Sequence, residues 1–170
     1  MTIQTSISTI INAPISLTFD NTVSADARVF AQKHGPIPGI AAIEGHTEPW
    51  SEPGQIREYT LTDQTKVTEE ITAFTLDHTY SYAVRDFTGP LRHFVKNARS
   101  EWHFTVQSSE TTRVDWTYFF NSKNPVAGIV LWLFIKLFWP GFMRQSLTVL
   151  KTNIQTNFEN QHSVYTPDQS

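Results

Sequence analysis

The feature that most constrains the fold is an apolar stretch near the end of the chain. Nearly every residue from 126 to 139 is apolar, and Lys136 is the only charged residue among them. A helix that is apolar on all sides has to be surrounded by protein, ligand or lipid. Pro125 suits the first position of such a helix, and Asn124 suits the N-cap before it. We therefore expect a long helix that begins at Pro125 and lacks a polar face in its first half.

After Pro140 and Gly141 the pattern of this helix becomes amphipathic. Apolar residues recur at steps of three or four, which places them on one stripe of a helix. These residues are Met143, Leu147, Leu150, Ile154 and Phe158. Polar residues such as Arg144 and Glu159 face away from the stripe. We expect the second half, to about Glu159, to pack against the rest of the protein along one face.

The chain before the helix consists mostly of predicted strands. Residue patterns typical of strands occupy residues 6–12, 40–48, 55–61, 66–76, 79–87, 97–107 and 112–120. Two short helices are predicted after the first strand, one beginning at Pro14 and one over residues 25–33. The strands follow one another in hairpins without alternating with helices. The predicted fold class is therefore α+β, with an antiparallel sheet of about six to seven strands and one long C-terminal helix.

Composition narrows the function classes. A chain of 170 residues is expected to form a single domain, here residues 1–161, and the polar tail 162–170 is expected to be disordered. A net charge of −3 argues against nucleic acid as a partner. The absence of cysteine excludes disulfides and thiol catalysis. The six histidines show no spacing typical of metal ligands, so no metal and no cofactor are expected.

The beginning of the chain lacks the basic start and apolar run of a signal peptide, so the expected location is cytoplasmic. Residues 126–142 form a candidate membrane segment, because a spanning helix needs roughly 17–25 residues. Lys136 and Pro140 argue against spanning. A contact with a membrane surface, or with a second copy in a homodimer, stays open as an alternative for this segment.

Several short motifs stand in a characteristic order along the chain. They are Ile-Ile-Asn-Ala-Pro at 10–14, Gly-Gln-Ile-Arg at 54–57, Asp-Gln at 63–64, Val-Thr-Glu-Glu-Ile at 67–71, Tyr82, Thr-Arg-Val-Asp-Trp at 112–116 and Leu-Lys at 150–151. With these motifs the chain resembles the START-like helix-grip superfamily (SRPBCC), in particular its polyketide cyclase/dehydrase-type branch, over roughly residues 6–160. Two features depart from the family pattern. Gln64 stands where the family often has glycine, and residues 126–139 are unusually apolar.

The resemblance implies a curved antiparallel sheet wrapped around the long C-terminal helix, with a cavity between them. Members of the superfamily mostly bind apolar small molecules or lipids there, and some catalyse cyclisation or dehydration. A fold does not determine a function, so the resemblance gives a class of ligand and not its identity.

Arg57 and Glu69 are the first candidate site residues. If the hairpin around Asp63 and Gln64 has a two-residue tip, Arg57 lies opposite Glu70, and a shift of one residue exchanges the two faces of the strand. An Arg–Glu pair on the concave face could orient a polar group of a ligand. The alternative, which we favour from the sequence, is a solvated ion pair across the strands.

Aromatic side chains give a second set of candidates. Alternation along the strands places them on shared faces, and they could line an apolar cavity or simply pack against the helix. The candidate ligand-binding residues are Arg57, Glu69, Tyr80, Tyr82, Trp102, Trp116, Tyr118, Met143 and Leu147. His103 lies near Glu101 and Asp115 and is the only histidine suited to acid–base work, although an outward-facing polar residue is the favoured interpretation.

Two hypotheses follow for function. The first is a protein that binds a hydrophobic small molecule or lipid in a cavity between the sheet and the helix. The second is an enzyme of the cyclase or dehydrase type acting on an apolar or aromatic substrate in the same cavity. No catalytic motif identifies catalytic residues. An ionisable pair buried in the cavity would favour the second hypothesis.

Overall fold

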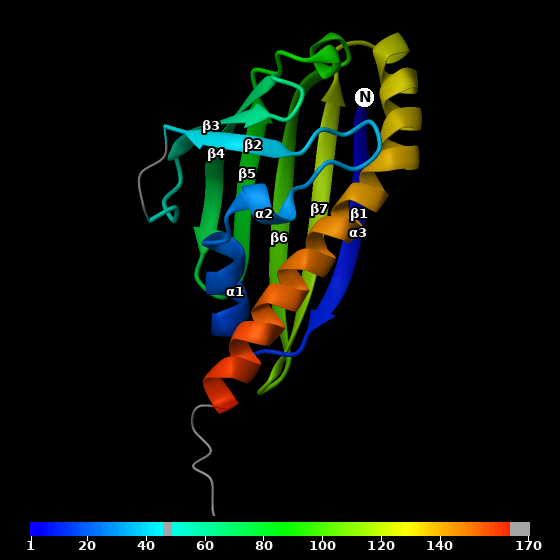
Figure 1. Ribbon diagram of the computed structural model, residues 1–170. Helices are drawn as coiled ribbons and strands as arrows, with labels where there is room; N and C mark the ends of the chain where they lie inside the picture. The colour runs from blue at the N-terminus through cyan, green and yellow to red at the C-terminus, as the bar shows by residue number, and fades with distance from the viewer. Residues whose placement is uncertain (46–48, 164–170) are drawn as a thin grey trace, which may run out of the picture.

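The computed structural model describes residues 1–45 and 49–163, and its centre is one antiparallel sheet of seven strands in the order β1-β7-β6-β5-β4-β3-β2 (Figure 1). The strands are β1 (Thr2–Ile11), β2 (Ile40–Glu44), β3 (Ile56–Leu61), β4 (Lys66–Thr75), β5 (Thr79–Arg85), β6 (Val95–Ser108) and β7 (Thr111–Ser122). The helices are α1 (Ile15–Val23), α2 (Ala27–Phe30), the short 3₁₀ helix η1 (Pro90–His93) and α3 (Pro125–Ser163). The predicted α+β helix-grip fold is confirmed.

The sheet buries one face and leaves the other largely to solvent. Along β5 every second residue is buried, and the buried ones are Tyr80, Tyr82 and Val84. This is the period of two that a half-buried strand requires. Helix α3 crosses the strands on the buried face, with α1 and α2 beside it (Figure 1). The hydrophobic core therefore lies between one face of the sheet and one side of α3.

Helix α3 is continuous through Pro140, which has no N–H group to donate to the preceding turn. Figure 1 shows a change of direction between the first part of α3, drawn in yellow, and its orange second part. Proline inside a helix is a common cause of such a bend. The predicted stripe in the second half is confirmed, since Met143, Leu147, Leu150 and Ile154 are all buried. The first half instead has one buried side and one exposed side.

The hairpin between β3 and β4 corrects the predicted register. Arg57 lies opposite Glu69, not Glu70, because the loop has three residues instead of two. Gln64 has a φ of 67°, the left-handed conformation that closes a three-residue hairpin loop. The sequence showed no glycine at this position to mark the longer loop. The one-residue difference brings Arg57 and Glu69 to the same face of the sheet.

Other element boundaries differ from the predictions by a few residues. Strand β1 begins at Thr2 and not at residue 6, and η1 was not predicted. Helix α3 continues through His162 and Ser163, which corrects the predicted start of a disordered tail. The rest of that tail, 164–170, lies outside the described residues, as do His46 and Glu48 in the predicted end of β2.

Candidate ligand site between the sheet and the C-terminal helix

A cavity of about 420 Å³ lies between the sheet, the first half of α3, and the segments around α2 and η1. The wall formed by α3 is entirely apolar or aromatic. It consists of Val130, Leu131, Phe134, Trp139 and Phe142. Some lining residues are also exposed at the surface, among them Pro36, Pro90 and Val130, so the cavity is not fully enclosed.

The sheet wall is built from aromatic residues that neighbouring strands place side by side. Tyr80 pairs with Trp102, which pairs with Trp116 on the next strand. The two tryptophan rings are stacked, with their centroids 4.2 Å apart. All three side chains are almost fully buried and line the cavity. Cross-strand aromatic pairs of this kind stabilise a sheet as well as forming a wall.

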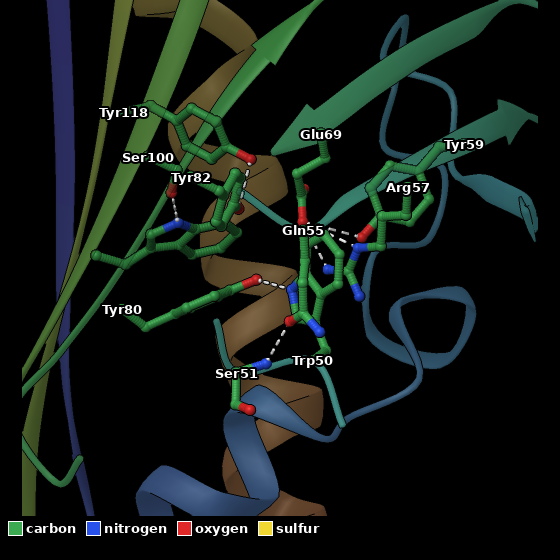
Figure 2. Close-up of polar contacts among 11 residues, drawn as sticks. Trp50, Ser51, Gln55, Arg57, Tyr59, Glu69, Tyr80, Tyr82, Ser100 and Tyr118 are labelled. Carbon is green, nitrogen blue, oxygen red and sulfur yellow. Dashed lines mark hydrogen bonds and ion pairs between the residues drawn. The ribbon is translucent and has the colours of Figure 1, made fainter. Parts of the chain in front are cut away.

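The adjacent row across the sheet contains a small residue between two tyrosines. Tyr82 pairs with Ser100, which pairs with Tyr118. Because Ser100 is small, the two phenol hydroxyls meet across it at 2.9 Å. Trp116 donates its indole N–H to the Ser100 hydroxyl at 2.7 Å (Figure 2). The row thus presents hydroxyl groups within an otherwise apolar wall.

A buried ion pair forms the polar part of the site. Arg57 donates from Nε and Nη2 to Oε1 of Glu69 at 3.0 and 2.6 Å, and the Tyr59 hydroxyl donates to the same oxygen at 3.3 Å (Figure 2). The side chains of Arg57 and Glu69 are only 11% and 7% exposed, and both line the cavity. The favoured prediction of a solvated pair is therefore wrong, because the three-residue loop turns both residues inward.

Trp50 holds this polar group in place. Its indole N–H donates to the Tyr80 hydroxyl at 2.6 Å, and its ring lies 4.2 Å from the Arg57 guanidinium. Figure 2 shows Trp50 between Tyr80 and Arg57. Gln55 orders the turn around Trp50, accepting from the backbone N–H of Ser51 at 2.8 Å and donating to the carbonyl of Pro49 at 2.9 Å.

Burial determines the charge states in the site. Burial raises the pKa of the Glu69 carboxyl, and the charge of Arg57 opposes this effect only in part. Burial is the largest influence on Arg57 and would lower its pKa, but Glu69, Tyr59 and Tyr80 together outweigh burial and the pKa is raised. Burial also raises the pKa of Tyr82 to about 12 and raises the pKa of Tyr80 well above its ordinary value. These two phenols stay neutral at physiological pH and can donate hydrogen bonds.

The candidate residues Met143 and Leu147 do not line the cavity, which corrects their prediction as ligand contacts. Both are buried in the core, because the second half of α3 packs directly on the sheet. The other seven candidates line the cavity together. His103 is half exposed and lies 3.9 Å from Glu101 on the outer side of the sheet, as the favoured interpretation expected.

Three residues important to the site were not identified from the sequence. Tyr59 lies two residues after Arg57 on the same strand, and this spacing would have placed it on the same face. Trp50 stands in a turn, and a large aromatic residue in a turn is a sign that the turn packs on the core. Trp139 gave no separate signal, because every neighbour in the apolar stretch was equally hydrophobic.

Residues 2–155 match the family model described as "Polyketide cyclase / dehydrase and lipid transport". The chain belongs to this family. The match confirms the resemblance to the START-like helix-grip superfamily. Proteins with this fold typically bind hydrophobic ligands. No curated protein matches the chain closely enough to add a more specific relative.

Solved structures agree with the family fold at low sequence identity. Norcoclaurine synthase from Thalictrum, as a point mutant in complex with a transition-state analogue, has a TM-score of 0.70 at 10% identity and covers 92% of this chain and 96% of its own. Ara h 8.0201 has a TM-score of 0.62 at 15% identity, with coverages of 92% and 99%. Ginseng major latex-like protein 151 from Panax ginseng has a TM-score of 0.63 at 13% identity, with coverages of 89% and 97%. At these identities the similarity shows the fold alone.

Proposed function

We propose that this protein binds an apolar or aromatic small molecule, or a lipid, in the cavity between the sheet and the first half of α3. The observation that carries the proposal is the cavity itself. Its volume of about 420 Å³ lies within the range of roughly 300–1,000 Å³ that is typical of small-molecule sites. Apolar walls with a few polar groups are also typical of such sites.

The two walls differ in polarity, and this difference suggests how a ligand lies. The α3 wall supplies only apolar surface, whereas the sheet wall carries Arg57, Glu69 and several phenol groups. A ligand with one polar group would turn that group toward the sheet.

A fluorescence titration with 1-anilinonaphthalene-8-sulfonate, an apolar probe with one anionic group, tests the proposal. Ala98 is buried and lines the cavity, so Ala98→Phe fills space that the probe needs. Ala73 is exposed on β4, and Ala73→Phe makes the same change outside the cavity. We expect Ala98→Phe to weaken probe binding about tenfold or more and Ala73→Phe to leave it unchanged. The proposal fails if a folded Ala98→Phe variant, judged by its Tm, binds as the wild type does.

A second candidate function is catalysis of the cyclase or dehydrase type. The observation that favours it is the ionisable pair in the cavity, with a Glu69 carboxyl whose pKa is raised by burial and with phenol donors beside it. A carboxyl whose pKa is raised by burial is better suited to proton transfer than an ordinary surface carboxyl. Glu69→Gln would then abolish turnover of a polyketide-like substrate in a variant that is still folded, judged by its Tm, and still binds the probe. Equal turnover by Glu69→Gln and wild type would exclude Glu69 as the acid–base group.

A further inference from the structure

The first half of α3 exposes large apolar side chains along the side that faces away from the sheet, and one of them, Val130, also lines the cavity. They are Val126, Ile129, Val130, Trp132, Leu133 and Leu137. Ile129 and Leu137 are 67% and 62% exposed. Most of these positions are three or four residues apart, so they form one continuous stripe, called here the outer face of α3. Contiguous exposed apolar surface of this kind marks an interaction site.

This property is confined to the first half of the helix. In the second half the exposed positions are polar and include Arg144, Thr148 and Thr152. The same helix therefore has an ordinary solvated surface once it passes Pro140. The apolar outer face is therefore a local feature of the first half. Packing of α3 on the core does not explain it, because the second half also packs on the core and has a polar outer side.

The charges in the stretch of chain that carries the outer face are all positive. Between Asp115 and Glu159 the sequence has four basic residues and no carboxylate, in a chain whose net charge is −3. Lys136 lies within the outer face, and its Nζ is 4.9 Å from the centroid of the Trp132 ring. Lys123 precedes the helix, and its backbone N–H donates to the carbonyl of Phe94, which brings η1 and its exposed Arg92 close by.

In the described part of the chain no carboxylate pairs with Lys123, Lys136 or Arg92. An apolar stripe bordered by unpaired cations is complementary to a bilayer with anionic headgroups. Lys136 can lay its stem along the apolar surface and reach the headgroups with its ammonium.

A second copy of the chain fits the outer face less well. In a two-fold dimer the same patch contacts itself, so the Lys136 residues of both copies would lie in one apolar interface. Two ammonium groups without a counter-ion in an apolar interface are unfavourable. An anionic bilayer instead neutralises them.

Spanning of the bilayer by α3 is also disfavoured. The helix is long and apolar enough to cross a membrane by length and composition. However, its inner side is part of the protein core, since Leu131, Ile135 and Met143 are almost fully buried. Crossing would require the helix to leave the sheet, whereas lying on the surface requires no change in the fold.

We propose that the outer face of α3 docks on the surface of an anionic membrane, with its apolar side chains in the interfacial region and Lys136, Lys123 and Arg92 at the headgroups. Val130 belongs both to the outer face and to the cavity lining, so docking places this edge of the cavity wall at the bilayer. The docking surface does not depend on which ligand the cavity holds, or on whether it holds one.

Co-sedimentation of the full chain with vesicles tests this inference. The vesicles are phosphatidylcholine alone, or phosphatidylcholine with about one quarter phosphatidylglycerol. Leu133→Glu/Leu137→Glu introduces two charges on the outer face. Thr148→Glu/Thr152→Glu introduces the same two charges on the polar outer side of the same helix. The nearer of these positions, Thr148, lies about 16 Å along the helix axis from Leu137. All four positions are exposed, so both variants are expected to keep the wild-type Tm.

We expect the wild type to sediment with the phosphatidylglycerol vesicles and much less with phosphatidylcholine alone. Leu133→Glu/Leu137→Glu should weaken this binding about tenfold or more, and the Thr148/Thr152 control should stay within about threefold. Lys136→Glu should reduce the preference for phosphatidylglycerol. The inference is overturned if the wild type binds neither vesicle or if both double variants lose binding equally. It is also overturned if the wild type is a dimer by sedimentation equilibrium that Leu133→Glu/Leu137→Glu dissociates.

Discussion

Arg57 and Glu69 form a mostly buried ion pair, with Nη2 and Oε1 2.6 Å apart and side chains only 11% and 7% exposed. Two neighbouring pairs, Glu58–Lys66 between β3 and β4 and Glu70–Arg85 between β4 and β5, are each more than a third exposed on at least one side chain. Alternation along β3 and β4 explains the difference, because successive residues face opposite sides of the sheet. Removing one partner of a buried pair lowers the free energy of unfolding more than removing one partner of a surface pair, because it leaves the other charge buried without a counter-charge.

We predict that Glu69→Gln destabilises the protein by about 3–5 kcal/mol, because it leaves the Arg57 guanidinium buried without a counter-charge. The free energy of unfolding in urea measures this loss. Replacing both partners, as Arg57→Met with Glu69→Leu, should cost less than Glu69→Gln alone, since no charge is left buried.

The matched control for that experiment is Glu70→Gln, one residue further along β4. Its partner Arg85 is partly exposed, so the loss should stay below about 1 kcal/mol. If Glu69→Gln and Glu70→Gln cost the same, the Arg57–Glu69 pair is solvated and this account of the site is wrong.

The buried phenols predict a loss of stability at high pH. Burial raises the pKa of Tyr82 from 10.0 to about 12. A group whose pKa is raised on folding contributes stability that is complete below its unfolded pKa and is lost as the pH rises toward its folded pKa. The free energy of unfolding should therefore hold constant up to about pH 10. Above that pH it should fall by about 1.4 kcal/mol per pH unit for each buried phenol whose pKa in the folded protein is higher than 10. Tyrosinate absorbance followed alongside unfolding checks this, and ionisation of these phenols near pH 10 in folded protein would contradict it.

The hairpin loop between β3 and β4 offers a stabilising change. Gln64 is exposed and adopts a φ of 67°, which costs a residue with a side chain roughly 1–2 kcal/mol. Gln64→Gly removes that cost but increases the flexibility of the unfolded chain. The net prediction is a gain of about 0.5–1 kcal/mol in urea unfolding. A loss of stability would show that the Gln64 side chain makes a contribution that its exposed position does not indicate.

A substitution at Leu147 tests whether a core residue outside the cavity affects stability without affecting ligand binding. Leu147→Ala should cost about 2–5 kcal/mol in unfolding because it leaves a void under the second half of α3. Its affinity for 1-anilinonaphthalene-8-sulfonate should nevertheless match the wild type, because Leu147 does not line the cavity. Weaker probe binding by folded Leu147→Ala would extend the cavity along the helix beyond the walls assigned to it.

Much of the fold could be predicted because it depends on local periodicity. Alternation in β5 and the three- and four-residue steps after Met143 identify a strand and a helix from the residues alone. The register of the β3–β4 hairpin could not be predicted, since it depends on the left-handed conformation of Gln64. A residue other than glycine gives little sign of that conformation.

The site was predictable to the extent that its residues share a strand face. Tyr80 and Tyr82 are two residues apart, and the sheet places them on one wall. The buried and exposed sides of a uniformly apolar helix could not be predicted in this way, because its sequence does not distinguish one side from the other. Phe142 at the cavity, Met143 in the core and Leu137 at the surface are equally hydrophobic, and only the packing of α3 on the sheet separates them.

The central claim is that a hydrophobic ligand occupies the space between the sheet and the first half of α3. Native mass spectrometry of the protein purified from its own cells tests this claim most directly. The account predicts a population heavier than the bare chain, whose added mass is extracted by organic solvent and is absent from a folded Ala98→Phe variant prepared in the same way. Bare chain alone in the wild type, with no uptake from a panel of fatty acids and aromatic compounds, would contradict it.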